Sequence, residues 1–249
     1  MQALQQSSVG NALLRYCTAD DFALLQPFLS RTHLELRMPL YEPNQPIHYV
    51  YFPEGGVCSI VAEQEAGDKV EVGLFGYEGM SGAPVILGAG QSPQASMIQI
   101  NGAPGFQIGA ADFIAACDRS GPLLKLMLRF VQAMNVQAAS TAAANAHYAL
   151  PERLARWLLM CHDRVDGDHL DLTHDFMSMM LAVRRSSVTV TLHTLEGTQA
   201  IRAVRGTVTV LDRNRLEEIA GESYGEAETE YRRLIGPFGK GKHGMEAVA

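Results

Sequence analysis

The sequence is poor in several features that mark special classes of protein. Its 249 residues include only four cysteines, one tryptophan and 19% charged residues. No run of about 18 uncharged apolar residues occurs, which argues against a membrane-spanning helix. The N-terminal stretch MQALQQSSVGNALL lacks the basic and apolar regions of a secretory signal. We therefore expect a cytoplasmic globular protein with one large or two small domains.

The cysteines exclude the usual metal and disulfide motifs. Cys17, Cys58, Cys117 and Cys161 form no C-x-x-C pair, and no histidine stands at zinc-finger spacing from them. We therefore predict buried free thiols and no metal site at these residues.

The charge is unevenly distributed. The chain carries a net charge of -7, which argues against non-specific coating of nucleic acid. Residues 184–215 nevertheless contain six arginines against Glu196 and Asp212, a local charge of +4. This segment is where we expect a polyanionic partner to bind.

The first half of the chain has the pattern of a helix followed by a β domain. Residues 18–30 begin with Thr18, a good helix cap, and two acidic residues follow in the first turn. From 33 to 108, six or more short β-rich runs at roughly ten-residue spacing are separated by turn signals such as EPNQP at 42–46. This pattern predicts an antiparallel sandwich or barrel within residues 1–120.

A long helix is predicted over residues 121–150. Part of it has the a/d spacing of a helix that packs along a partner helix. The residues of this stripe are Leu123, Met127, Phe130, Met134, Gln137 and Thr141. We predict a dimerisation helix; the alternative is a helix packed on its own domain, because two heptads are fewer than a confident coiled coil requires.

The C-terminal part has the element order of a winged helix-turn-helix. Pro151 interrupts the long helix and starts an amphipathic one, so we place a domain boundary near 150. Thr173 is the expected cap of a short helix, and a turn around 182–184 leads to a second helix that ends at Gly197. The run AIRAVRGTVTVLD then predicts a hairpin. The winged module is assigned to 151–220 and a C-terminal extension to 221–249.

The second helix of such a motif enters the DNA major groove at its N-terminal end. Arginine and hydroxyl side chains at that end suit guanine edges and phosphates, and Arg205 at the hairpin tip suits a phosphate. Val188 and Leu192 should face the core. A solvated helix start is the alternative for the arginine pair, although cations are disfavoured there by the helix dipole. The alternative for His193 is a helix-filling role. The predicted DNA-contacting residues are Thr173, His174, Arg184, Arg185, Ser186, Ser187, Thr189, His193, Arg205 and Thr207.

These segments, above all LTHDFMSMMLAVRRSSVTVTLHTLE followed by IRAVRGTVTVLD, resemble the cyclic-AMP receptor/Fnr (Crp/Fnr) family of bacterial transcription regulators over about residues 15–220. The resemblance implies an α+β protein with an N-terminal antiparallel β-roll, a homodimer, and double-stranded DNA with a two-fold symmetric operator as partner. RNA polymerase is a candidate further partner. Arg185 matches a DNA-contacting arginine of the family. The tail EEIAGESYGEAETEYRRLIG resembles an extension found in one branch, with no mechanism assigned.

The effector region departs from the family pattern. Cyclic-nucleotide-binding members carry a Gly-Glu pair and later an Arg-Ser/Thr pair, whose arginine neutralises the cyclic phosphate. Here the second pair is replaced and the arginine is missing, a loss on the order of 3 kcal/mol or more for a buried phosphodiester. Cyclic-AMP control is therefore doubtful, and the effector is unknown. The candidate pocket residues are Glu78, Gly79, Ser81, Gln94, Ala95 and Ser96. The alternative for Glu78 and Ser81 is an exposed turn.

Other cofactors and functions find less support. An iron-sulfur cluster is not expected, because Cys17 stands alone near the N-terminus, and His33, His48 and Met97 give no haem-ligand signature. A cupin-like metal enzyme would need closely spaced histidines, which the β region lacks. A ligand-binding or scaffold protein with a protein-binding C-terminal module is the other alternative. We predict a DNA-binding regulator that is not an enzyme.

Overall fold

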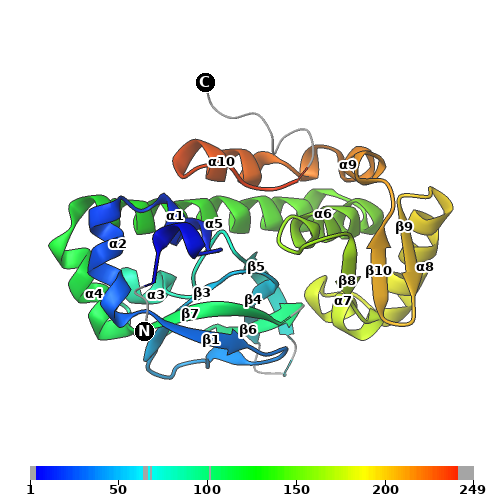
Figure 1. Cartoon of the computed structure of the whole chain (residues 1–249). Helices are drawn as coiled ribbons and strands as arrows, with labels where there is room; N and C mark the ends of the chain where they lie inside the picture. Colours follow the sequence, from blue (N-terminus) through cyan, green and yellow to red (C-terminus); the bar gives the residue numbers. More distant parts are fainter. Residues whose placement is uncertain (1–3, 64–66, 68, 101, 241–249) are drawn as a thin grey trace.

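The computed structural model of the chain describes residues 4–63, 67, 69–100 and 102–240 (Figure 1). The N-terminal segment is helical, as predicted: the Thr18 hydroxyl accepts a hydrogen bond of 3.1 Å from the Asp21 amide at the start of α2. The elements of this segment are η1 (Gln6–Ser8), α1 (Ala12–Tyr16), α2 (Ala19–Leu25) and η2 (Gln26–Phe28).

Among the described residues, seven strands follow and form a β-roll of two antiparallel sheets. One sheet has the order β1-β7-β3 and the other the order β2-β6-β4-β5. A short helix, α3 (Ala83–Ile86), lies between β5 and β6 along the chain. The strands are β1 (Ser30–Leu34), β2 (Pro39–Tyr41), β3 (Tyr49–Pro53), β4 (Val57–Glu63), β5 (Lys69–Phe75), β6 (Ala95–Ile100) and β7 (Ala103–Gly109). The predicted antiparallel β domain is therefore confirmed.

Three helices follow the roll, and the third of them is the first helix of the C-terminal module. They are α4 (Ala110–Arg119), α5 (Gly121–His147) and α6 (Leu150–His162). The Ser120 hydroxyl caps α5 by accepting from the Leu123 amide at 3.3 Å, and Pro122 occupies the first turn, where its missing N–H costs nothing. Helix α5 runs along the roll as far as the C-terminal module (Figure 1).

The stripe predicted to bind a second subunit instead faces the interior of the same chain. Leu123, Met127 and Phe130 are fully buried in the core of the roll, and Gln137 is only 4% exposed. The Gln137 side-chain oxygen accepts a hydrogen bond of 2.8 Å from the Leu74 amide of β5. The prediction was wrong because heptad spacing identifies an apolar face without identifying its partner, and the roll is the partner here.

The C-terminal module contains a three-stranded sheet of order β8-β10-β9 and a helix pair. Its elements are β8 (His169–Asp171), α7 (His174–Met180), α8 (Arg185–Gly197), β9 (Ile201–Val204), β10 (Thr207–Val210) and α9 (Arg213–Ala220). After α9 the chain turns back through η3 (Gly221–Ser223), and α10 (Glu226–Leu234) lies along α5 (Figure 1).

Two hydrophobic cores hold the molecule together. One fills the roll, and the other joins the winged module to the outer face of the β2-β6-β4-β5 sheet through Val57, Val61, Leu74 and Ile100. The four cysteines are free and buried, as predicted. Within the described ranges, no helix has both the length and the apolar character needed to cross a membrane.

Candidate nucleic-acid interface

The helix pair α7 and α8 is built around a buried apolar stripe. The Thr173 hydroxyl caps α7 by accepting from the Phe176 amide at 3.2 Å. Met177 of α7 and Val188 and Leu192 of α8 are buried in the second core, as the spacing of the latter two predicted. The turn between the helices includes Ala182 in a left-handed conformation, with φ of 52°, which costs an alanine roughly 1 kcal/mol. The packing thus fixes the direction in which α8 presents its outer face.

The outer face of α8 is polar at its N-terminal end. Arg184, Arg185 and Ser186 are exposed there, and His193 is exposed two turns further along. Between them Val190 is 67% exposed, although it is not among the residues predicted to contact DNA. Its position, four residues after Ser186 and three before His193, was the available signal, because residues at these spacings share one helix face.

Two of the predicted contact residues hold the two helices together. The Thr189 hydroxyl donates to the Arg185 carbonyl at 3.2 Å, and it therefore accepts the 2.9 Å hydrogen bond from Nδ1 of His174. Arg185 itself lies 3.1 Å from Oδ1 of Asp175, and both side chains are mostly exposed. An exposed pair of this kind contributes little to stability, so the guanidinium stays available for another anion.

The β9–β10 hairpin forms a wing beside α8. Its tip consists of Arg205 and Gly206, both with positive φ (44° and 85°), the combination that a two-residue type I′ turn requires. The Arg205 side chain is exposed at this tip. Thr207 is half-buried, and its hydroxyl donates a long hydrogen bond of 3.5 Å to Asp171.

Glu196 connects the wing to α8. Its Oε1 accepts a 2.8 Å hydrogen bond from the Ala203 amide of β9, and its Oε2 lies 3.2 Å from Nδ1 of His193. The carboxylate therefore sets the distance between the helix and the wing, and it also restrains His193. The sequence analysis used Glu196 only in the charge count of residues 184–215, because the sequence alone does not show its contacts with the wing.

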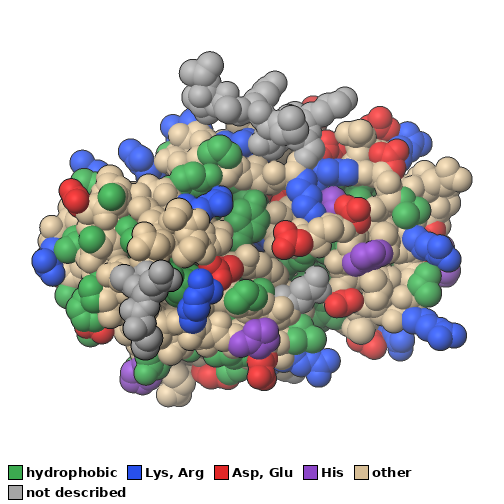
Figure 2. Space-filling view, viewed as in Figure 1, with side chains coloured by type: hydrophobic (Ala, Val, Ile, Leu, Met, Phe, Trp, Pro, Cys, Tyr) green, Lys and Arg blue, Asp and Glu red, His purple; other side chains and the backbone are tan. Residues whose placement is uncertain are grey.

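The local excess of arginine separates into two groups. Arg184, Arg185, Arg202 and Arg205 are exposed around α8 and the wing. Figure 2 shows Lys or Arg side chains projecting from this end of the molecule. Arg213 instead points inward to Asp163, at 2.8 Å, and Glu217, while Arg215 pairs with Glu218 at 2.8 Å. Four of the six arginines are therefore exposed around α8 and the wing, Arg215 is exposed on α9, and Arg213 alone of the six points inward.

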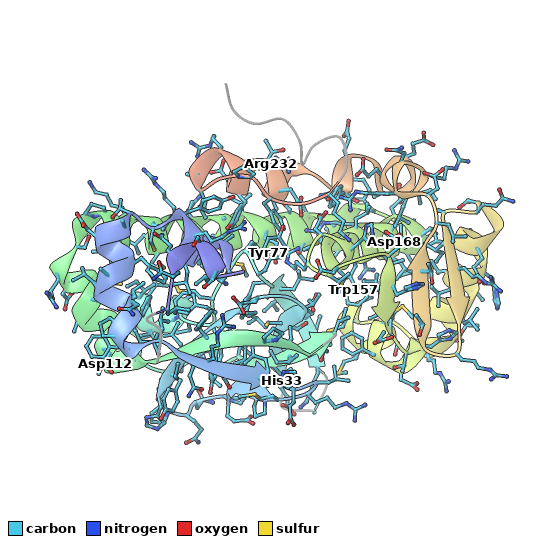
Figure 3. All side chains as sticks on the ribbon, in the orientation of Figure 1. His33, Tyr77, Asp112, Trp157, Asp168 and Arg232 are labelled. Carbon is cyan, nitrogen blue, oxygen red and sulfur yellow. The ribbon has the colours of Figure 1, made fainter. Side chains whose placement is uncertain are left out.

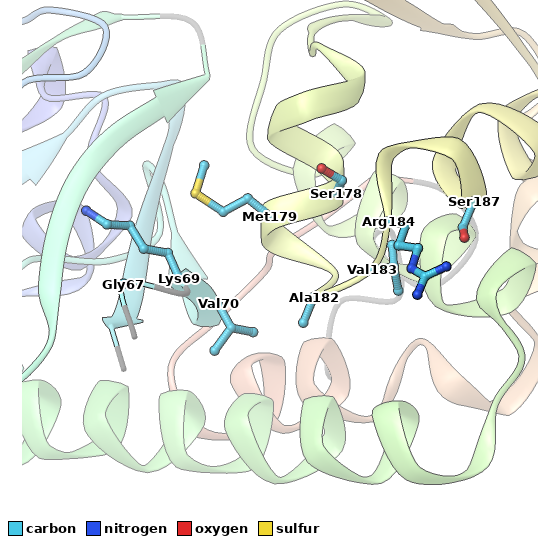
Figure 4. Close-up of a pocket in the computed structure, with 9 residues that line it drawn as sticks. All are labelled: Gly67, Lys69, Val70, Ser178, Met179, Ala182, Val183, Arg184 and Ser187. Atoms are coloured by element: carbon cyan, nitrogen blue, oxygen red, sulfur yellow. The ribbon is translucent and has the colours of Figure 1, made fainter. Parts of the chain in front are cut away.

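An open hollow of about 940 Å³ lies between the first residues of β5 and the end of α7, the turn that follows it and the start of α8 (Figure 4). Lys69 and Arg184 lie on opposite sides of it, and Met179 and Val70 contribute apolar surface. The hollow leaves the N-terminal end of α8 open on this side.

The candidate effector residues fall into two groups with different surroundings. The Glu78 carboxylate receives a 2.7 Å hydrogen bond from Nε of Arg164 on the segment after α6, and a 2.9 Å bond from the Gly76 amide. The Glu78 and Arg164 side chains are each 2% exposed. Burial raises the pKa of the Glu78 carboxyl, and the Arg164 guanidinium opposes that rise. Arg164 is a partner that local sequence spacing could not have found.

Gly79, Ser81 and Gln94 also have internal partners or tight surroundings. A Cβ on Gly79 would lie 2.6 Å from the Phe130 ring, and the buried Ser81 hydroxyl accepts from the Tyr51 amide at 2.9 Å. Gln94 accepts from the Ser92 hydroxyl at 2.7 Å, just before Ala95 and Ser96 begin β6. In the part of the chain that the structure describes, no group of three or more His, Cys, Asp and Glu residues is placed to hold a metal ion.

These features define a class of protein: a β-roll joined by a long helix to a winged helix-turn-helix module. The family model of the Crp-like helix-turn-helix domain matches residues 152–219, which run from α6 to α9. No curated protein sequence matches the chain.

Solved structures match over most of the chain. A protein from Eubacterium rectale assigned to the Crp/Fnr family of transcriptional regulators is 16% identical, with a TM-score of 0.66, covering 85% of this chain and 98% of that one. A Crp-family transcriptional regulator from Thermus thermophilus is 18% identical, with a TM-score of 0.65, covering 78% and 98%. The c-di-GMP-responsive global regulator CLP from Xanthomonas campestris is 16% identical, with a TM-score of 0.62, covering 78% and 99%. Residues 152–219 are thus a Crp-like helix-turn-helix domain, and the chain has the Crp/Fnr fold.

Proposed function

We propose that the protein is a sequence-specific DNA-binding transcription regulator that acts as a homodimer. The observation that carries this proposal is the outer face of α8, where Arg184, Arg185 and Ser186 are exposed beside the Arg205 wing tip on a Crp-like helix-turn-helix domain. Cations at the positive end of a helix dipole are unfavourable by themselves, and a phosphate backbone removes that penalty.

Helix α8 would lie in the major groove with its N-terminal end foremost. Arg184 and Arg185 would bind phosphates or the two acceptors of a guanine edge, and the exposed Val190 would contact a thymine methyl group. Arg205 at the wing tip would bind a phosphate of the neighbouring backbone. Glu196 would hold the wing and helix at the separation that these contacts require.

The dimer would form through the outer face of α5, opposite the predicted stripe. From Phe130 to Pro151 the chain has no Asp, Glu, Lys or Arg, an unusual composition for an exposed helix face. Exposed positions of α5 recur at steps of four and three residues, and they are Leu128, just before this stretch, and Gln132, Asn135, Ala139, Ala142 and Ala146 within it. Small side chains permit close helix approach, so a partner α5 would pack along this face. The two α8 helices would then read half-sites about 34 Å apart.

A cyclic nucleotide held at Glu78 is not part of this proposal. The Glu78 carboxylate is bonded to Arg164, and a ligand at that position would have to displace a fully buried ion pair. Such a displacement is costly because it leaves a guanidinium buried without its partner.

The proposal is tested by selecting bound sequences from random DNA duplexes with the purified full chain. We expect a two-fold symmetric motif. Arg185→Ala should then weaken binding to a selected duplex by about 10- to 100-fold and flatten the dependence of affinity on salt. Arg233→Ala on α10 is the matched control and should bind like the unmodified protein. If no motif is enriched, or if Arg185→Ala binds as tightly as the control, the proposal fails.

A further inference from the structure

The C-terminal extension crosses the molecule and returns to the end of α6, close to where it began. It leaves the winged module after α9, crosses α6 and α5, touches the roll, and returns to the end of α6 (Figure 1). Both ends of this path bind the same side chain: the Tyr224 hydroxyl donates to Oδ2 of Asp163 at 2.5 Å, and the Lys240 amide donates to Oδ1 at 2.8 Å. We call residues 221–240 the strap.

Between these two anchors the strap binds the roll. The Tyr231 hydroxyl donates a 2.6 Å hydrogen bond to the main-chain carbonyl of Glu78, on the turn that follows β5. The Tyr16 hydroxyl of α1 donates to the Pro237 carbonyl at 2.9 Å. Tyr231 and Phe238 are buried in the same core as the roll, with ring centroids 5.0 Å apart. Tyr77, labelled in Figure 3, packs against Phe238 from the roll, with ring centroids 6.1 Å apart.

The strap also binds the helix that starts the winged module. Nε of the buried Arg156 on α6 donates to the Ser223 carbonyl at 2.8 Å. The Lys240 ammonium donates to the Gly167 carbonyl, just before β8, at 2.5 Å. Asp163 in addition pairs with Arg213 of α9 at 2.8 Å. A carboxylate at the negative C-terminal end of α6 is unfavourable unless it has such donors, so Asp163 depends on these contacts.

Two adjacent residues therefore connect the strap to both modules. Asp163 binds the two ends of the strap and α9, whereas Arg164 pairs with Glu78 of the roll and lies 4.9 Å from the centre of the Phe238 ring. The cavity left among Glu78, α5, Arg164 and α10 is about 10 Å³, which is roughly the space of one water molecule at most. The strap fills the junction where the roll, α5 and α6 meet.

We propose that the strap is an intramolecular clamp that holds the winged module in one fixed orientation on the roll. The arrangement that it holds leaves the outer face of α8 and the tip of the wing exposed. A chain clamped in this way needs no small molecule to order the junction. The part of this inference that concerns DNA rests on the proposed function, while the mechanical part does not.

The test uses the full chain with the double substitution Tyr231→Phe and Phe238→Ala, which removes the Tyr231 hydrogen bond to the Glu78 carbonyl and the contacts of the Phe238 ring with the roll. Tyr231→Phe alone is the milder variant, and Arg233→Ala is the control because Arg233 pairs with Glu230 on the outside of α10. Circular dichroism verifies that each variant is folded. Hydrogen exchange followed by mass spectrometry then reports on residues 76–82 of the roll and 156–168 of α6 and the following turn.

We expect amide exchange in both segments of the double variant to be at least tenfold faster than in the control, with an intermediate effect for Tyr231→Phe. Faster exchange confined to residues 226–240 would overturn the clamp. Affinity for a selected duplex should fall at least tenfold in the double variant. An affinity within twofold of the control, together with faster exchange in both modules, would refute the link to DNA binding but not the clamp. If the unmodified chain binds no DNA, the proposed function fails and the exchange result still decides on the clamp.

Discussion

Nε1 of Trp157 on α6 donates a 2.7 Å hydrogen bond to Oε1 of Glu71 on β5, across the junction between the roll and the winged module. Trp157 is labelled in Figure 3. The other oxygen of Glu71 accepts a hydrogen bond from the Ser59 hydroxyl of β4. Burial raises the pKa of Glu71 to about 7, and these two hydrogen bonds and the guanidinium groups of Arg164 and Arg156 limit the rise.

Glu71 should make the stability of the protein depend on pH. Its pKa is higher in the folded than in the unfolded chain, so the folded state retains the proton to higher pH. The stability from this group is complete below the unfolded pKa of about 4.5 and is lost as pH rises through about 7. We expect the unfolding free energy to fall by on the order of 3 kcal/mol over this window, relative to Glu71→Gln. Urea unfolding at a series of pH values measures this difference. Glu218→Gln, at an exposed site, should keep the unmodified pH profile; equal profiles for both variants would contradict the prediction.

Asp175 should restrain Arg185 and weaken DNA binding. Asp175→Asn removes the partner 3.1 Å from the guanidinium and also a negative charge beside the phosphates. We expect affinity for a selected duplex to rise severalfold, corresponding to about 1 kcal/mol, with a steeper salt dependence. Fluorescence anisotropy at several salt concentrations measures both quantities. Asp20→Asn on α2 serves as the control and should change neither; an unchanged affinity for Asp175→Asn would show that the pair does not restrain Arg185.

A side chain at Gly79 should destabilise the folded protein. A Cβ at this position would lie 2.6 Å from the buried Phe130 ring, so Gly79→Ala forces α5 or the turn to move. We expect a loss of roughly 1–3 kcal/mol in unfolding free energy. Gly197→Ala is the matched substitution, because nothing lies within 4 Å of its Cβ and alanine favours the helical backbone by roughly 0.5–1 kcal/mol. Chemical denaturation should therefore give shifts of opposite sign, and a stabilised Gly79→Ala would refute the close approach.

The outer face of α5 should control oligomeric state. Ala142→Glu places a charge on each of two facing helices, and we expect it to convert a dimer to a monomer in sedimentation-velocity runs at micromolar concentration. Ala111→Glu, at an exposed position of α4, should leave the dimer intact. A dimer that persists in Ala142→Glu would show that the subunits associate through another surface.

The parts of the structure that the sequence could predict are those that depend on neighbouring residues. Alternation in KVEVGLF predicted β5, and the positions of Val188 and Leu192 predicted the buried side of α8. The parts that could not be predicted depend on long-range contacts. Glu78 and Arg164 are 86 residues apart in the chain, and the local sequence around either residue does not predict that the two pair. The local charge of +4 included Arg213, but Arg213 pairs with the buried Asp163, which lies 50 residues earlier in the chain.

One sheet of the roll has no solvent-facing side where it meets the winged module. Leu74 and Phe75 are consecutive on β5, yet Phe75 packs in the core of the roll and Leu74 in the core shared with α6. The sheet therefore has a hydrophobic core packed on each of its two faces. Because close-packed interiors compress little, a side chain that shifts on one side must displace the strand and then the atoms behind it. A change of shape inside the roll would thus reach the winged helix-turn-helix module through a single sheet.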